Sequence, residues 1–242
     1  MGLGPFKRTG FRTSLYTTTT AIREAYVGML RIDELGRKYR YALAGGALIA
    51  GQITIAKAIA AVHVNEAILA SVPIGETVLD VTVTAGTALV SDQLKGGMFQ
   101  IQDGTGEGHT YVIASNTAIT TATTSVHITL AEPIRVALDT TSEFTLVSSP
   151  WWGITHSTGI GAVTGGAICV IASGSYGWVQ TGGMGQVLTQ ETTTVGFGYE
   201  QSTTSGSVDT QDTDGQEAVT IGYQLGIAGV SGDFMPCIWT ID

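Results

Sequence analysis

The chain has 242 residues, of which 43% are hydrophobic and 13% charged, and its formal net charge is −9. Ordinary soluble domains carry about 25% charged residues, so the surface of this protein must consist largely of small polar residues. Such a surface suits a protein that is buried against other subunits, whereas an isolated cytosolic enzyme usually has a densely charged surface. Two distant cysteines exclude a disulfide framework and a CxxC zinc site, and charged or polar residues interrupt the most apolar stretch, 41–72, so no membrane span is predicted.

A basic N-terminal arm is predicted over residues 1–46. The first 40 residues carry eight basic and three acidic side chains, a net charge of +5, whereas the remainder carries −14. A basic segment on an acidic body indicates docking on an acidic partner. Nucleic acid is the alternative partner, but Thr and aliphatic residues dilute the basic side chains and the acidic body repels phosphate. After an extended Thr-rich start, the turn-like Asp33–Gly36 favours two short strands over a helix.

Residues 47–148 are predicted to form a first β region, either a small barrel or a sandwich. Its opening stretch, 47–72, mixes Ala with β-branched residues, so a short helix and an extended crossing segment both stay open. Residues 76–84 alternate polar and apolar side chains with period two, which is typical of a half-buried strand. The Asp-Gly turn within Asp103–Gly108 predicts a hairpin. Further strands are expected at 98–102, 109–114, 125–130 and 142–147.

Residues 149–242 are predicted to form a second, glycine-rich β region. Gly-Gly pairs at 165–166 and 182–183 indicate bends, and the polar stretch 201–215 is expected to be a loop. Strands are expected at 167–171, 176–180, 185–189, 217–222 and 234–241. The fold class predicted for the whole chain is therefore all-β, with antiparallel β-barrel or sandwich regions and an extended N-terminal arm.

The motifs predict no catalytic, metal or cofactor site. Asp103–Gly108 precedes a strand-like stretch, so a hairpin turn is favoured over a phosphate cradle, and its two carboxylates are too few for a calcium loop. The four histidines lack metal-ligand spacing, and no Gly-x-Ser-x-Gly elbow occurs. Asp209, Asp212 and Asp214 favour a solvated loop over a cation site. Triads assembled by geometry stay open, but the chain is predicted not to be an enzyme.

Two adjacent tryptophans, Trp151 and Trp152, follow Pro150 at the predicted boundary between the two β regions. Packing at that junction is favoured for them over a platform for a sugar ring, because neighbouring side chains in an extended segment point in different directions.

Four phrases, taken in order along the chain, resemble virion structural proteins of tailed bacteriophages. They are GRKYRYALAGGALIAGQ (36–52), QIQDGTGEGHTYVIASNT (100–117), ITLAEPIRVALDTTSEFTLV (128–147) and YGWVQTGG (176–183). The resemblance covers most of residues 30–200, and the proteins that it points to look like the capsid decoration, or cement, proteins of marine and cyanobacterial phages. It implies a particle component, often at high copy number, and it leaves head and tail locations open.

The expectation that follows is a capsid decoration protein on the virion surface, assembled in the host cytoplasm. Its arm would lie across junctions of the major capsid protein, and the β body would self-associate, with a homotrimer expected; neither nucleic acid nor membrane is an expected partner. The predicted contact residues of the arm are Arg8, Arg12, Arg23, Arg31, Arg37 and Arg40.

Two other functions remain as alternatives. Trp151, Trp152 and Trp178 motivate a carbohydrate-binding host-recognition module on a tail or fibre. A glycan-cleaving enzyme would need two carboxylates roughly 5–10 Å apart in a cleft, and the scattered acids of this chain give no sign of such a pair.

Overall fold

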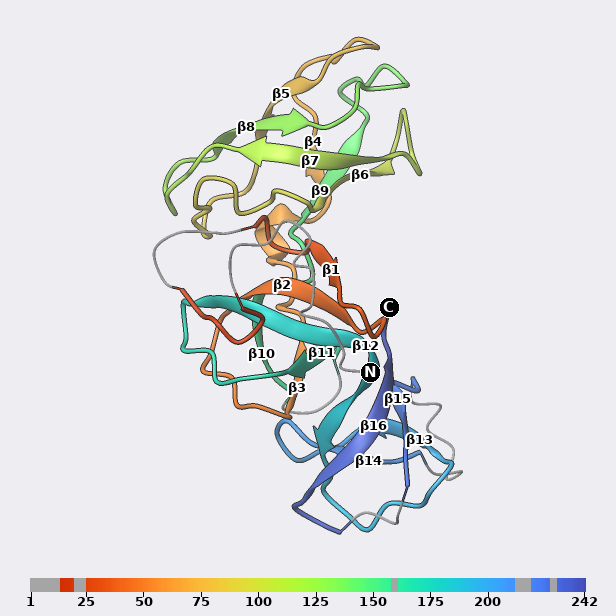
Figure 1. Cartoon of the computed structure of the whole chain (residues 1–242). Coiled ribbons are helices and arrows are strands. Elements are labelled where there is room, and N and C mark those ends of the chain that lie inside the picture. The colour runs from red at the N-terminus through yellow and green to blue at the C-terminus, as the bar shows by residue number, and fades with distance from the viewer. Residues whose placement is uncertain (1–13, 20–24, 158–160, 212–218, 227–229) are drawn as a thin grey trace. The chain divides into compact units, whose positions relative to one another are not determined.

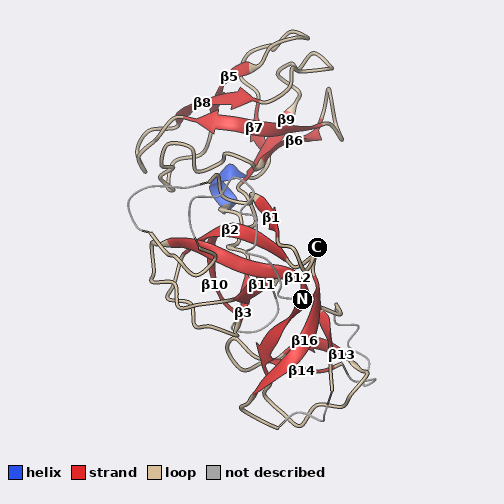
Figure 2. Ribbon diagram, in the orientation of Figure 1, coloured by secondary structure: helices blue, strands red, loops and turns tan. Residues whose placement is uncertain are grey.

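The computed structural model describes residues 14–19, 25–157, 161–211, 219–226 and 230–242. Strands make up nearly all of its regular structure, and the only helix in these ranges is one 3-10 turn, η1 (Ala61–His63), as Figure 2 shows. The predicted all-β class is therefore confirmed. The chain divides into two compact units: Met1–Lys57 together with Trp151–Asp242, and Ala58–Pro150, which lies between these two segments in the sequence. We call them the split unit and the inserted unit.

A five-stranded barrel forms the first half of the split unit (Figure 1). Its strands pair in the closed order β2-β10-β3-β11-β12 and back to β2, and a short strand, β1, forms a hairpin with β2. The pairing of β10 with β2 is parallel, and the other pairings in this barrel are antiparallel. The strands are β1 (Leu30–Ile32), β2 (Lys38–Ala44), β3 (Ile53–Ile55), β10 (Trp152–His156), β11 (Val163–Ala167) and β12 (Tyr176–Leu188).

The long strand β12 continues from this barrel into a second set of strands (Figure 1). Its first half pairs with β2, and its second half, from Gly182 to Leu188, pairs with β16. The order then runs β16-β15-β13-β14, and a bridge between Thr189 and Val208 brings β14 back to the end of β12, so this half also closes on itself. The further strands are β13 (Gly198–Gln201), β14 (Val208–Thr210), β15 (Gly222–Gln224) and β16 (Phe234–Thr240).

Each half of the split unit has its own apolar core. Tyr39, Tyr41 and Trp178 are buried together in the first half, next to a cluster that contains Leu48 and Ile154. In the second half, β16 alternates strictly: its buried residues enter the core and the residues between them face outward. The core of the second half consists of Ile53, Val187, Tyr199, Val208, Ile221, Cys237 and Trp239.

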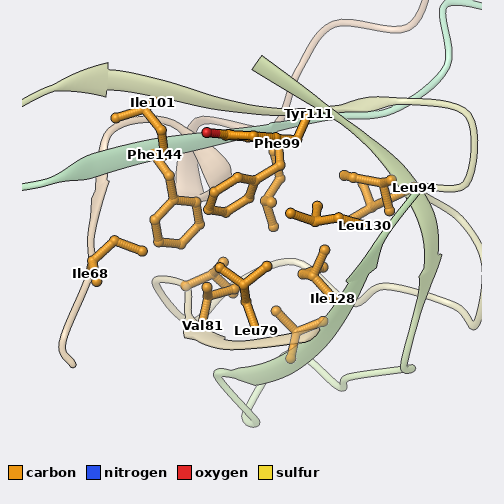
Figure 3. Packing of buried hydrophobic residues seen from close by; sticks show 14 of the residues in the cluster. Ile68, Leu79, Val81, Leu94, Phe99, Ile101, Tyr111, Ile128, Leu130 and Phe144 are labelled. Atoms are coloured by element: carbon orange, nitrogen blue, oxygen red, sulfur yellow. The ribbon is translucent and has the colours of Figure 1, made fainter. Parts of the chain in front are cut away.

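The inserted unit is a six-stranded antiparallel sheet in the order β4-β9-β6-β7-β8-β5, folded around one core. Buried and more exposed residues alternate along β5, β6 and β8. Figure 3 shows the rings of Phe99 and Phe144 stacked in the centre, with centroids 5.2 Å apart. Its strands are β4 (Glu66–Ala67), β5 (Val78–Thr82), β6 (Met98–Asp103), β7 (Thr110–Asn116), β8 (Ser125–Leu130) and β9 (Glu143–Val147). The hairpin predicted around Asp103–Gly108 joins β6 to β7.

The predicted boundary of the N-terminal arm at residue 46 needs correction. Strand β2 lies inside the barrel, paired with β10 on one side and β12 on the other, and both of its tyrosines are fully buried. The predicted first β region also begins too early, because β3 at Ile53–Ile55 belongs to the split unit. The distribution of charge led to the prediction that residues 1–46 form one arm. The burial of Tyr39 and Tyr41 instead shows that β2 is part of a core.

Two further predictions change in detail. The stretch 47–72, left open between helix and extended chain, contains β3, the turn η1 and β4, so it is mostly extended. The predicted loop 201–215 contains β14, and its residues 212–215 lie outside the described ranges.

Candidate functional site

The six predicted contact arginines divide into two groups. Arg8, Arg12 and Arg23 lie outside the described residues. Arg31 lies on β1, Arg37 directly precedes β2, and Arg40 lies on β2. These three side chains contact the chain's own acids and rings.

Arg40 joins three separate parts of the split unit. Its Nε and Nη2 atoms donate to the two carboxylate oxygens of Asp242 at 2.6 and 3.1 Å, and Nη1 donates to the carbonyl oxygen of Gly28 at 2.9 Å. The guanidinium carbon lies 4.7 Å from the centre of the Trp151 ring. The hydrogen bond from Arg40 lowers the pKa of Asp242, and the bond from Thr181 adds to this effect. Such a bidentate pair is among the stronger polar contacts in proteins.

Arg37 stabilises the turn before β2. Its Nε donates to Asp33 Oδ2 at 2.7 Å, while the backbone N–H groups of Leu35 and Arg37 donate to Asp33 Oδ1 at 3.0 and 2.9 Å. Partial burial alone would raise the pKa of Asp33, but these hydrogen bonds outweigh it and lower the pKa. Arg31 lies over the Trp178 ring, with 5.6 Å between its guanidinium carbon and the ring centre.

The three tryptophans that motivated a sugar platform are packing residues of the split unit. Trp178 and Trp152 are buried, and Trp151 is partly buried with its Nε1 donating to the Thr164 carbonyl oxygen at 2.9 Å. Trp152 and Trp178 are buried and the Arg40 guanidinium group lies over the Trp151 ring, so the packing interpretation fits this geometry better than an exposed platform does.

Few of the described titratable side chains lie close to one another. Within the described residues, no group of three His, Cys, Asp or Glu side chains could hold a metal ion. Burial lowers the pKa of His63 and of His156, and these residues lie in different units. The structure does pair two carboxylates, Glu200 and Asp209, directly across β13 and β14. Sequence reasoning missed this pair because the register of two short strands was not predictable.

An apolar row crosses the outer face of the second half of the split unit. Met184 on β12 is paired with Ile238 on β16, which is paired with Tyr223 on β15. These side chains are 61%, 38% and 47% exposed. Residues paired across neighbouring strands lie on one face, so the three form a continuous strip, which we call the outer apolar row. Contiguous exposed apolar surface of this kind marks interaction sites.

A second feature that favours binding to a partner protein is the edge strand β1. It stands at the end of the strand order, so its outer edge is not paired with any other described strand. Leu30 and Ile32 are exposed on it, and Leu35 is exposed in the turn that follows. An edge with free backbone groups can accept a strand from a partner.

An open cavity of about 490 Å³ lies in the split unit, beside the point where β12 leaves the first barrel. Its lining includes Trp239, Gln180 and Gly185, with Tyr16 and Phe234 exposed at the rim. Sequence reasoning did not predict this cavity, because its lining residues come from segments that are far apart in the chain.

Comparisons with known proteins give no relative for this chain: no protein-family model, no curated protein and no solved structure matches it. Among the described residues, no helix is long and apolar enough to cross a membrane.

Proposed function

We propose that this chain is a structural protein of a bacteriophage particle that binds the outside of the capsid shell and stabilises it, acting through surface contacts and self-association as a homotrimer. The observation that carries the proposal is the outer apolar row, Met184, Ile238 and Tyr223, on a chain with only 13% charged residues. The resemblance of four sequence phrases to phage decoration proteins supplies the choice of the capsid as partner.

The energetics of the row suit a protein that is present in many copies. Fully burying a side chain such as Met or Ile contributes about 1.5–3 kcal/mol, and these residues are already partly covered, so each contributes less. One row therefore gives a weak contact. Tethering through several such contacts raises the effective concentration of each one, and weak contacts between neighbours then add to stable attachment.

The basic N-terminal segment supplies a second contact. We propose that Arg8, Arg12 and Arg23 meet acidic surface of the major capsid protein, and that β1 offers its free edge to an added strand. Arg37 and Arg40 contribute to this contact indirectly, by holding the β1–β2 hairpin through Asp33 and Asp242.

The decisive experiment is co-sedimentation of the purified chain with empty capsid shells. Replacing Ile238 by Asp places a carboxylate in the centre of the row, and its desolvation opposes burial against any partner. We expect binding to shells to fall about tenfold or more, because avidity multiplies the loss at each contact.

Val170→Asp is the matched control for this experiment. Val170 is 66% exposed in the same unit, and it lies between β11 and β12, away from the outer apolar row. We expect this variant to bind shells as the parent chain does. Equal binding by the Ile238 variant and the control would show that the row is not the contact surface.

The alternative, a carbohydrate-binding module on a tail or fibre, loses its original motivation because Trp151, Trp152 and Trp178 are packing residues. Particle stoichiometry separates it from decoration: hundreds of copies on the head support the proposal, and a few copies confined to the tail reject it.

A further inference from the structure

The outer apolar row is the centre of a larger uncharged face on the second half of the split unit. Along β12 and β16, every second pair of residues has its side chains on this side, because paired residues of neighbouring strands share one face of a sheet. Strand β15 adds Tyr223, which is paired with Ile238. We call this surface the outer face. Its residues are Met184, Gln186, Leu188, Tyr223, Phe234, Pro236 and Ile238, and none of them carries a charge.

Much of the outer face is open to solvent. Phe234 and Tyr223 are each 47% exposed and Met184 is 61% exposed, whereas the alternate residues of β16, such as Cys237 and Trp239, are buried in the core behind the sheet. A fully enclosed aromatic residue buries about 150–250 Å², so Phe234 and Tyr223 each leave about 70–120 Å² uncovered. Together with its other residues, the outer face reaches the few hundred Å² of contiguous apolar surface that mark an interaction site.

Charged residues lie at the borders of the outer face. Lys38 on β2 is paired with Gly182, where β12 enters the face, and Asp233 directly precedes Phe234 at the opposite end. Glu200 lies on β13, the strand beyond β15. An apolar centre with a charged and polar rim is the usual composition of a protein–protein interface.

The lack of charge within the outer face indicates the kind of partner. Where copies of one chain meet about a symmetry axis, residues near the axis lie close to their own copies, so a charge there would face the same charge. Each copy carries a net charge of −9, and like charges brought together at an interface oppose association. A face that binds a different protein can use charges, because its partner can supply opposite ones. We propose that the outer face packs against the outer faces of neighbouring copies of this chain and forms the apolar core of a homotrimer.

The size of the outer face suits a closed ring of copies. Against a single neighbour it would cover less than the about 800 Å² that each partner of a standard complex covers. In a trimer each copy contacts both others, so the contacts reinforce one another. The inference rests on the proposed function for the number of copies, and it assigns the loss of shell binding expected for Ile238→Asp to the loss of the trimer.

The first test is sedimentation velocity on the full chain without capsid shells, over a series of concentrations from low micromolar to sub-millimolar. We expect the parent chain and Val170→Asp to shift from monomer to trimer alike as the concentration rises. Ile238→Asp should weaken association about tenfold or more, because a carboxylate in the centre of the face must lose its water and meet its own copies. A parent chain that stays monomeric throughout, or equal association of the two variants, would overturn the inference.

The second test uses opposite charges at Met184, which is exposed enough to be replaced without disturbing a core. We expect Met184→Lys and Met184→Glu each to associate about fivefold or more weakly than the parent chain, and an equal mixture of the two to recover most of the loss, because opposite charges then meet. Circular dichroism of each variant checks that it is folded. A mixture that associates no better than its components would show that the face does not meet its own copies.

The two proposals fail separately. A trimer that does not co-sediment with shells would reject the proposed function and leave the role of the outer face intact. Shell binding by a chain that stays monomeric at every concentration would reject the role of the outer face and leave attachment to the capsid intact.

Discussion

At the scale of single residues, charge in this chain is used for internal order. Arg40 was predicted to contact a capsid, yet its guanidinium group joins Asp242, the Gly28 carbonyl and the Trp151 ring. An arginine with three internal partners has little freedom left for an external one. The residues that remain available for contact are apolar, such as Ile238 and Tyr223, which were predicted only as parts of strands.

The Arg40–Asp242 pair makes the split unit sensitive to acid. Because the pKa of Asp242 is lowered in the folded chain, this contribution to stability is complete above the ordinary carboxyl pKa of about 4 and is lost as the pH falls through the lower folded value. We expect Asp242→Asn to cost about 1 kcal/mol at neutral pH, a charged hydrogen-bond energy reduced for partial exposure, and to lose this difference near pH 2.

The measurement for this prediction is urea unfolding at a series of pH values. Glu191→Gln serves as control, because Glu191 is an exposed carboxylate in the same unit. If the two variants lose the same stability at neutral pH, the internal role of Arg40 and Asp242 is refuted.

At the scale of elements, glycines decide where strands turn and how closely they approach. Gly183 in β12 has a φ of +80°, and a Cβ atom there would lie 3.1 Å from the Arg37 Cα, so the strand passes the β1–β2 turn only as glycine. In the β6–β7 hairpin, Gly104 has a φ of +75° and a Cβ atom there would overlap the Thr141 carbonyl oxygen. Both requirements come from contacts with distant residues.

The hairpin offers a matched pair of substitutions. Gly108 has a φ of +80° but nothing within 4 Å of its Cβ position, so Gly108→Ala should cost about 1 kcal/mol for backbone strain alone. Gly104→Ala adds a clash with fixed backbone, and we expect it to destabilise the inserted unit by at least about 3 kcal/mol. Thermal unfolding followed by circular dichroism measures both; similar losses for the two variants would contradict the contact with Thr141.

At the scale of the whole molecule, the arm is shorter than its charge pattern predicted. Removing residues 1–40 would delete β1 and the first three of the seven residues of β2, and with them the buried Tyr39, so that truncation would unfold the split unit. A test of the arm must therefore stop before the described Ser14.

We expect deletion of residues 1–13 to leave both units folded, because it removes no residue of the described cores. The loss of Arg8 and Arg12 should reduce binding to capsid shells several-fold at low salt, with a smaller effect at high salt because exposed charges are screened. Sedimentation at two salt concentrations measures this. Full-strength binding by the truncated chain would reject the arm as a contact.

Much of the inserted unit was predictable from local pattern. Residues 76–84 alternate with period two, and the Asp-Gly turn predicts the β6–β7 hairpin; the structure has β5 and that hairpin in those places. These features depend on residues that are adjacent in the sequence, so the local sequence pattern is sufficient to predict them.

The sequence by itself determined that this chain is all-β, poor in surface charge and divided by glycine-rich turns, because strand alternation and turn chemistry are local properties. Only the tertiary structure decided that β2 pairs in parallel with β10, that β12 pairs with strands in both halves of one unit, and that Gly166, Gly185 and Trp239 line a cavity. These depend on pairings between residues far apart in the chain, and a strand of three residues such as β3 contains too few side chains to specify its partners in advance.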